Sequence, residues 1–204
     1  MYLHCDAVTK YFDEKLIFKN VSFEASTGNS IAIIGPNGSG KTTLLRILCN
    51  LMQPTEGIVK YKHNGNVLLK QQAYRYFSLI GPYLELYEQL TARENLTFFA
   101  KMQDIPNYPN LLTRLMQRMN LSGREDDPVK TYSSGMKQRL KYVFALLSEP
   151  KILFVDEPRA NLDEEGIDTV YSILTEQRKK GILIIATNDS EDLKFADYKV
   201  TVHA

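Results

Sequence analysis

Three short apolar runs divide this chain and predict buried strands. They occupy residues 30–34, 152–155 and 182–186, and polar residues, Gly or Pro flank each of them. Runs of four or five residues that are rich in Ile, Leu and Val, without helical spacing, suit strands that are buried in a sheet. The pattern therefore predicts a sheet in the interior of the protein.

Helical spacing separates these apolar runs. At residues 91–94 the sequence forms a capping box, in which Thr91 is the N-cap and the Glu94 side chain reaches back to it. The predicted helices cover residues 42–48, a stretch that begins at 91, residues 111–119, a stretch from 132 to about 148, and a stretch that ends at 180. Because strands alternate with helices, the pattern indicates the α/β class.

The remaining apolar stretches predict shorter strands. Residues 2–8 and 16–25 are typical of two strands joined by a turn at residues 13–15. Further strands are predicted at residues 58–61, 67–69, 74–80 and 197–202. Roughly residues 83–134 then form a helical insertion between strands.

Charge and composition restrict the functions that the sequence allows. The 204 residues include 25 basic and 24 acidic side chains, a net charge of +1, and this balance argues against a nucleic-acid partner. The two cysteines, Cys5 and Cys49, match no metal-binding spacing and indicate a reduced, cytosolic environment. The sequence has neither a signal peptide nor an apolar run of the roughly 20 residues that cross a bilayer. We therefore expect any membrane role to require a separate partner.

A glycine-rich motif lies between the first buried strand and the helix after it. Residues 35–43 read GPNGSGKTT and match G-x-x-x-x-G-K-[ST], the phosphate-binding loop. The glycines let successive backbone N–H groups point into one concavity at a helix N-terminus. Lys41 can reach the β- and γ-phosphates of a nucleotide, and the Thr42 hydroxyl can ligate Mg²⁺. The flanking strand and helix favour this interpretation over a Gly-rich turn that matches by chance. The candidate ATP-binding residues of the loop are Gly35, Pro36, Asn37, Gly38, Ser39, Gly40, Lys41, Thr42 and Thr43.

Two carboxylates come directly after the second buried strand. They are Asp156 and Glu157, at the end of a strand where open α/β sheets place their ligands. Asp156 can hold Mg²⁺ directly or through water, and Glu157 can accept a proton from an attacking water molecule. A solvated acidic turn is the alternative, and the phosphate-binding loop in the same chain argues against it. We therefore expect Asp156 to be a metal ligand and Glu157 to be a catalytic base.

Two further stretches leave alternatives open. Residues 132–139 read YSSGMKQR and begin a helix, and small residues at a helix N-terminus can bind an anion. Taken alone, an N-cap by Ser133 or Ser134 is the simpler interpretation. An adenine base can stack on the ring of Phe12 or Tyr11, and ordinary strand packing of these rings is equally compatible with the pattern.

The order of four motifs carries a family resemblance. GPNGSGKTT, YSSGMKQR, ILFVDEP and ANLD occur in this order, and the chain resembles the ATP-binding-cassette (ABC) ATPases over essentially its whole length. The resemblance implies a single ATP-binding domain over residues 1–204. In that domain a P-loop nucleoside triphosphatase core of the α/β class carries an antiparallel β subdomain and an inserted α-helical subdomain. It also implies ATP and Mg²⁺ as cofactors.

The resemblance implies further roles at the dimer interface and around the base. ABC ATPases pack head to tail, and their signature motif contacts the ATP that a second subunit holds. In this chain that motif would be Ser133, Ser134, Gly135 and Met136. Phe12 falls at the adenine-stacking position of the family, with Tyr11 as the alternate, and Asp163 falls in the loop that crosses the dimer interface.

Three positions depart from the family pattern. The family usually has a Gln near Mg²⁺ and the attacking water, and counting back from residues 90–91 places Pro82 there. Asn188 stands where the family usually has a His that contacts the γ-phosphate. We expect Asn188 to be a catalytic residue that donates a hydrogen bond but carries no proton near neutral pH. Met136 replaces the usual Gln and is similar to the exporter-type ATPases. The candidate replacements for the missing Gln are Glu85, Gln71 and Gln72.

By resemblance, the chain is the ATP-binding and ATP-hydrolysing subunit of a transporter, an exporter whose membrane subunits are separate polypeptides. It is similar to the short ATPases of haem export and cytochrome c maturation. The resemblance implies a homodimer or heterodimer of ATPase subunits at the cytoplasmic face of the membrane. Two alternatives stay open: a soluble ABC ATPase outside transport, and a degenerate cassette that binds ATP but hydrolyses it weakly. The motifs do not encode the transported substrate, because its contacts lie in the membrane subunit.

Overall fold

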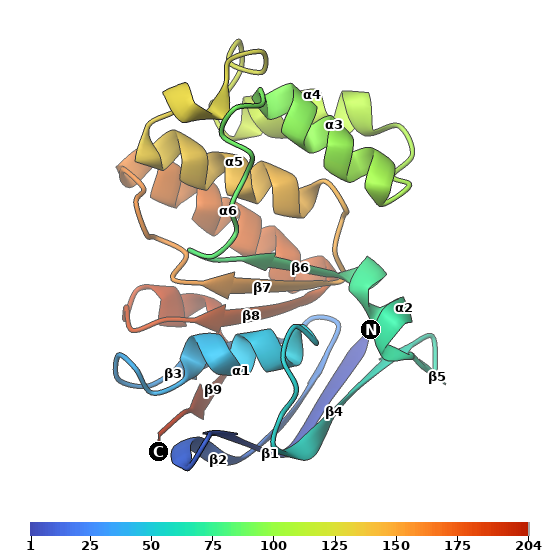
Figure 1. Ribbon diagram of the computed structural model, residues 1–204, viewed down its shortest axis with the longest axis vertical. Helices are drawn as coiled ribbons and strands as arrows, with labels where there is room; N and C mark the ends of the chain where they lie inside the picture. Colours follow the sequence, from blue (N-terminus) through green and yellow to red (C-terminus); the bar gives the residue numbers. More distant parts are fainter. Residues whose placement is uncertain (204) are drawn as a thin grey trace.

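The computed structural model describes residues 1–203, which form two sheets and the helices around them (Figure 1). Residue 204, the last residue of the predicted domain, lies outside the described part. The antiparallel sheet has the order β2 (Lys15–Ser26), β1 (Tyr2–Phe12), β4 (Glu56–His63) and β5 (Asn66–Val67). The second sheet is parallel throughout, with the order β6 (Phe77–Ile80), β7 (Ile152–Asp156), β8 (Ile182–Ala186), β3 (Ser30–Ile34) and β9 (Tyr198–Thr201).

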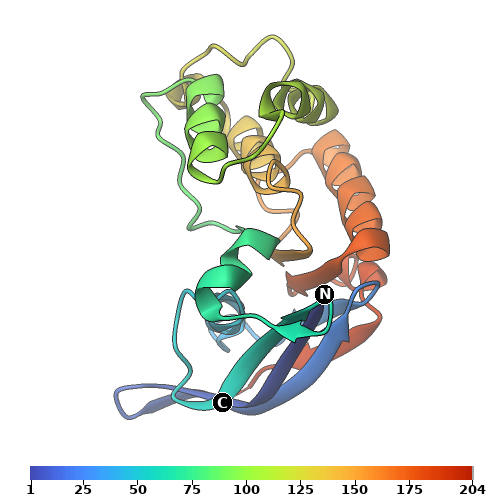
Figure 2. The same ribbon diagram turned by 90° about the vertical axis from the view of Figure 1, so that its right-hand side faces the viewer.

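The helices cover both faces of the parallel sheet. Helix α1 (Lys41–Leu48) packs between the two sheets, and the short helix α2 (Lys70–Ala73) precedes β6 (Figures 1 and 2). The opposite face is covered by α5 (Ser134–Leu146) and α6 (Glu164–Lys180). Helices α3 (Ala92–Met102) and α4 (Tyr108–Arg118) pack outside them. Among residues 1–203, none of the helices has the length and apolar character that crossing a membrane requires.

Burial on both faces explains why the apolar runs are continuous. On β7, Ile152 and Phe154 belong to the core around α1, whereas Leu153 and Val155 belong to the core under α5 and α6. Successive side chains of a strand point to opposite faces, so a sheet that is covered twice needs an apolar residue at every position. The three predicted buried strands are confirmed as β3, β7 and β8.

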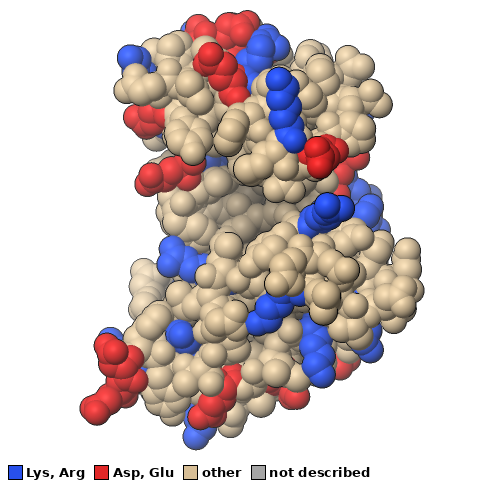
Figure 3. Space-filling model, turned by 45° about the vertical axis from the view of Figure 1, so that its right-hand side comes forward, with Lys and Arg blue, Asp and Glu red and all other residues tan. Residues whose placement is uncertain are grey.

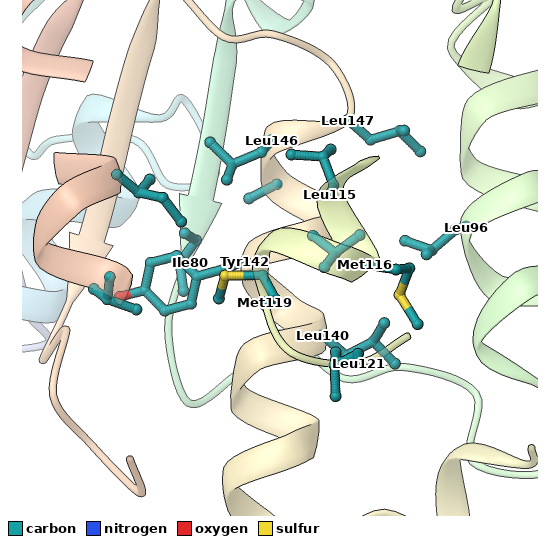
Figure 4. Close-up of a cluster of buried hydrophobic side chains, with 14 of the residues drawn as sticks. Ile80, Leu96, Leu115, Met116, Met119, Leu121, Leu140, Tyr142, Leu146 and Leu147 are labelled. Carbon is teal, nitrogen blue, oxygen red and sulfur yellow. The ribbon is translucent and has the colours of Figure 1, made fainter. Parts of the chain in front are cut away.

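The helical layers share one apolar core. Leu115 and Met116 of α4, and Met119 just after it, belong to the same buried cluster as Leu96 of α3 and Leu140 of α5 (Figure 4). The Leu- and Met-rich stretch of the fourth helix is therefore ordinary core.

Charged side chains of both signs share the molecular surface. On the face that Figure 3 shows, basic and acidic residues are scattered singly or in small groups over a mostly uncharged surface. This distribution agrees with the balance of 25 basic and 24 acidic residues in the sequence. Among the described residues on this face, neither sign of charge forms an extended field of the kind that steers a highly charged partner.

The predicted capping box of α3 is confirmed. The hydroxyl of Thr91 accepts a hydrogen bond from the backbone N–H of Glu94 at 3.1 Å, and the Glu94 carboxylate accepts one from the N–H of Thr91 at 2.8 Å.

The predicted strand over residues 74–80 is wrong in its first half. Residues 70–73 form α2, residues 74–76 form a 3₁₀ turn, and only Phe77–Ile80 pair as a strand. The partner strand explains the boundary, because Phe77 pairs with Ile152, the first residue of β7. Tyr74 also donates a hydrogen bond from its hydroxyl to the carbonyl of Asn50 at 2.9 Å, which holds the turn against the segment after α1.

We expect Phe154→Ala to lower the free energy of unfolding by about 3–5 kcal/mol, because it leaves a cavity in the core. Phe154 is fully buried, and its ring lies 5.7 Å from that of Phe77, edge to face. Urea denaturation measures the change. Phe98 has 55% of its surface exposed, so Phe98→Ala is the matched control and should change stability by less than about 1 kcal/mol. Equal losses in the two variants would contradict the assignment of the core.

Candidate functional site

The predicted phosphate-binding loop connects the parallel sheet to the N-terminus of α1. Gly40 is the N-cap of this helix, with φ 99°, and a Cβ there would lie 2.5 Å from Cγ2 of Ile17. A Cβ on Gly35 would collide with the carbonyl oxygen of Val202. The loop therefore passes closely under β2 and the end of β9, which only glycine allows at these two positions. The first N–H groups of α1 have no helical partners and form a positive end that attracts anions.

Lys41 lies in the concavity of the loop with 7% of its surface exposed. Its ammonium group donates to the carbonyl oxygens of Gly35 at 2.8 Å and Pro36 at 3.2 Å. It also donates to Oδ1 of Asn188 at 2.9 Å. The loop thus holds a positive charge where a phosphate group would meet the helix N-terminus.

Thr42 and Asp156 join α1 to the end of β7. The Thr42 hydroxyl donates to Oδ2 of Asp156 at 2.6 Å. Burial raises the pKa of the Asp156 carboxyl, although the hydrogen bond from Thr42 and the charge of Lys41 oppose the shift. A hydroxyl and a carboxylate are hard oxygen ligands, which suit Mg²⁺. Residues 1–203 contain no group of three His, Cys, Asp or Glu side chains that could hold a metal. Mg²⁺ in phosphate sites uses one or two protein ligands and completes its shell with water and phosphate, so the Thr42–Asp156 pair fits this ion.

Glu157 follows β7 and lines one pocket together with Lys41, Thr42 and Asp156. Its φ is 52°, and its backbone N–H donates to the carbonyl of Ala186 at 2.9 Å. Burial raises the pKa of Glu157, whereas the charge of Lys41 lowers it and that of Asp156 raises it. A carboxylate with a raised pKa is a better proton acceptor. The pocket has a volume of about 310 Å³ and is lined by Ile17, Asn37, Gly38, Gly40, Lys41, Thr42, Thr43, Pro82, Asp156 and Glu157.

Both neighbours of Asn188 are held by side-chain contacts that the sequence analysis missed. The Thr187 hydroxyl donates to Oδ2 of Asp192 at 2.6 Å, and burial raises the pKa of that carboxyl. Arg159 donates to Oδ2 of Asp189 at 2.6 Å. The first contact lies within the segment after β8, and the second ties that segment to the one after Glu157. The acidic cluster after the strand, NDSED, is the only signal in the sequence that points to them.

The predicted signature residues begin α5, and one of them, Ser134, lines a second pocket. Ser133 is the N-cap of α5, and its hydroxyl accepts from the N–H of Met136 at 3.2 Å. Ser134 lines a pocket of about 360 Å³ together with Asn161, and Lys41 is not among its lining residues. Asp163 is the N-cap of α6, where Oδ1 accepts from the N–H of Gly166 at 3.0 Å. The structure therefore places the signature beside the loop that ends at Asp163, and the Ser134 pocket shares Pro82, but not Lys41, with the pocket of the phosphate-binding loop.

The predicted adenine-stacking ring is not among the residues that line the pocket around Lys41. Phe12 is 43% exposed at the end of β1, and the ammonium group of Lys10 lies 5.0 Å from the centre of its ring. Tyr11, the alternate, pairs with Leu16 in the antiparallel sheet. Ile17 and Pro82 form the apolar part of the pocket, and the sequence does not indicate Ile17 because its contact with the loop is a tertiary one.

Pro82 lines the phosphate pocket, whereas its candidate replacements lie elsewhere. Gln71 and Gln72 are on α2, and Oε1 of Gln72 accepts from the backbone N–H of Leu69 at 2.9 Å. Glu85 lines the pocket of the signature residues. None of the three is among the residues that line the Lys41 pocket.

We expect Asp156→Asn to raise the free energy of unfolding at pH 7 by about 1 kcal/mol, or Tm by about 2–4 °C. Burial raises the pKa of Asp156 above its ordinary value of 3.8, so its ionised form destabilises the fold. The amide oxygen of Asn can still accept from Thr42. The advantage should disappear below pH 3.8, where Asp156 is neutral in both states, and grow as the pH rises through the raised pKa.

Thermal unfolding as a function of pH, without nucleotide or Mg²⁺, measures this difference. Asp168 is exposed on α6, so Asp168→Asn is the control and should leave Tm unchanged at every pH. A Tm for Asp156→Asn that falls at pH 7 would show that the carboxylate stabilises the fold, against the expected sign.

The comparisons with known proteins agree with this geometry. Residues 18–160 match a family model described as ABC transporter. The cytochrome c biogenesis ATP-binding export protein CcmA of Vibrio vulnificus (strain YJ016) is 30% identical over 195 residues, which cover 96% of this chain and 94% of the relative. An uncharacterized ABC transporter ATP-binding protein of Bacillus subtilis, YybJ, is 34% identical over 186 residues, 91% of this chain and 84% of the relative.

The solved structures place the fold in the same group. The ATP-binding subunit of an ABC transporter superposes with a TM-score of 0.88 at 28% identity, over 100% of this chain and 86% of the other. A putative ABC transporter ATP-binding protein from Pyrococcus furiosus shares the fold at 22% identity, with a TM-score of 0.84, over 99% and 98% of the two chains. The predicted α/β fold, with its antiparallel sheet and its added helices, is confirmed. This chain belongs to the ABC transporter family, among its ATP-binding ATPases.

Proposed function

We propose that this chain binds Mg-ATP and hydrolyses it to drive export through separate membrane subunits, at the cytoplasmic face of the membrane. The observation that carries the proposal is the convergence of Lys41, the Thr42–Asp156 pair and Glu157 on one pocket. Members of the family bind ATP, generally with Mg²⁺, and ATP-binding subunits of transporters work with membrane subunits. Relatives named as export proteins support the direction of transport.

The geometry supports a division of labour among these residues. Lys41 and the N–H groups at the start of α1 bind the phosphates, and Thr42 and Asp156 hold Mg²⁺, which neutralises phosphate charge when it is bound. Glu157 accepts a proton from water as the water oxygen attacks the γ-phosphorus and the bond to the β–γ bridging oxygen breaks. The products are ADP and inorganic phosphate.

We further propose that the complete site needs a second subunit, in a homodimer or a heterodimer. Ser134 lines a pocket that does not include Lys41, which supports a role for Ser133, Ser134, Gly135 and Met136 toward the nucleotide of the partner. The loop that ends at the N-cap Asp163 lies next to the signature. Gly135 packs so closely on it that a Cβ at this position would lie 3.2 Å from the carbonyl oxygen of Asn161. Phe12 remains a candidate for stacking on the adenine, since its ring is exposed.

One observation favours a second candidate, a cassette that binds ATP and hydrolyses it weakly. Pro82 lines the pocket beside Asp156 and Glu157, and its side chain offers neither a donor nor an acceptor to orient the attacking water. The two candidates differ in turnover alone: an ordinary enzyme reaches about 1–10³ per second, and a weak one remains far below this range.

We expect Lys41→Ala to abolish measurable binding of Mg-ATP, because the variant loses the only ammonium group in the loop. Isothermal titration calorimetry measures the affinity. Lys179 is exposed on α6, so Lys179→Ala is the matched control and should bind as the parent does. A parent protein that does not bind ATP would overturn the proposed function, and so would unchanged affinity in Lys41→Ala.

We expect Glu157→Gln to lower turnover by about 10²- to 10⁴-fold, the contribution of a general base, while ATP still binds. The ATP-bound variant should accumulate as a dimer, because the phosphate contacts remain while the bond is not cleaved. Phosphate release and light scattering with Mg-ATP measure the two effects. If the variant binds ATP but stays monomeric at high concentration, the head-to-tail arrangement is wrong.

A further inference from the structure

All three N–H donors of the Lys41 ammonium group have partners within the protein. The acceptors are the carbonyl oxygens of Gly35 and Pro36 and Oδ1 of Asn188, at 2.8, 3.2 and 2.9 Å. An ammonium group has only three donors and accepts nothing. A phosphate oxygen that contacts Lys41 must therefore replace one of these three acceptors.

The contact with Lys41 fixes the orientation of the Asn188 amide. Because Lys41 only donates, the amide must present its oxygen to the ammonium group, and its NH₂ group then points the other way. On that side it donates to Oδ1 of Asn37, which belongs to the phosphate-binding loop. Lys41, Asn188 and Asn37 thus form one directional hydrogen-bond chain.

Asn188 is the acceptor that can leave. The carbonyl of Pro36 also accepts from the N–H of Ser39 at 3.1 Å, and Gly35 is packed under the carbonyl of Val202, so the loop backbone holds both carbonyls in place. The oxygen of Asn188 is carried by a side chain with two rotatable bonds. A negatively charged phosphate oxygen is a stronger acceptor for an ammonium group than a neutral amide is.

We propose that Asn188, held by Asn37, competes with the nucleotide phosphates for Lys41 and thereby lowers the affinity for ATP. This proposal rests on the proposed function of the site. Asn37 acts through Asn188, because its oxygen aims the amide at Lys41, and it is therefore a positioning residue. When a phosphate takes Lys41, the amide of Asn188 is released and its NH₂ group is free to turn toward the phosphate. The same side chain thus weakens binding and supplies a donor during hydrolysis.

Removal of either asparagine should tighten nucleotide binding, the opposite of what loss of a ligand contact does. In the Glu157→Gln background, which prevents turnover, we expect Asn188→Ala and Asn37→Ala each to lower the Kd for Mg-ATP about threefold to tenfold, on the scale of one net hydrogen bond. The double variant should match Asn188→Ala alone, because Asn37 has nothing left to orient. Calorimetry with Mg-ATP measures all three.

With Glu157 intact, Asn188→Ala should lower KM and kcat together, since the competitor and the donor are lost at once. Asn110 is exposed on α4, so Asn110→Ala is the matched control and should leave Kd, KM and kcat unchanged. Asn188→Leu removes the same hydrogen bonds and keeps the number and branching of the side-chain heavy atoms, and it replaces Asn188→Ala if thermal unfolding shows that the alanine variant is not folded.

The outcomes separate this proposal from the function on which it rests. If the parent binds Mg-ATP but neither Asn188 variant binds it more tightly, the competition does not exist. Additive effects of Asn37→Ala and Asn188→Ala would show that Asn37 acts independently, which also overturns the hydrogen-bond chain. If the parent does not bind ATP at all, the proposed function fails and the competition with it.

Discussion

The parallel register of three strands is the constraint on which the site depends. Ile33 of β3 and Asp156 of β7 both pair with Ala186 of β8, so the three strands end at one edge of the sheet. The segments after these strands therefore meet there: the phosphate-binding loop, Glu157, and Asn188 after β8. The Thr42–Asp156 hydrogen bond spans 114 positions of sequence and is short only because this register holds. Two close-packed faces keep it fixed, since sliding a strand by one residue would bring each side chain to the opposite core, where its shape does not match its neighbours.

Burial removes water from the two carboxyls at this edge of the sheet and so disfavours their ionised forms. Burial raises the pKa of both Asp156 and Glu157, which means that the folded chain disfavours their ionised forms. Lys41 opposes the shift at both carboxyls, but it is shared with the loop carbonyls and Asn188. Perturbed carboxyls of this kind cluster at functional sites, where a cation and a phosphate compensate each other and the surrounding charges. The fold thus retains an electrostatic cost, and a cation bound at Asp156 would relieve the part of it that comes from this carboxylate.

The sequence predicts the parts of this structure that depend on local pattern. The buried runs, the capping box at Thr91 and the loop before Lys41 are determined by neighbours within a few residues, so periodicity and motif spacing identify them. The turn at residues 74–76 was mistaken for a strand, because the strand boundary depends on where the partner β7 begins. Ile17 was missed for the same reason, since it reaches the loop only through the packing of β2 on Gly40.

Contacts between distant segments limited the prediction at position 188 as well. The structure places Asn188 on Lys41 and on Asn37, which lies 151 positions away, whereas the sequence indicated only a donor to phosphate.

The hydrogen bond between Asn188 and Lys41 depends on the chemistry of the Asn188 amide. An amide carries a donor and an acceptor on different atoms and does not titrate near neutral pH, so the contact of Asn188 with Lys41 keeps its strength across that range. An imidazole at the same place would lose its acceptor on protonation and would then repel the ammonium group, which makes the competition for Lys41 dependent on pH. The proposed effect of Asn188 on ATP affinity therefore needs no change in the protonation of residue 188. Pro82 contributes no polar group to the pocket. In the proposed competition, the balance between ATP binding and hydrolysis therefore depends on how readily the Asn188 oxygen gives up Lys41 to a phosphate oxygen.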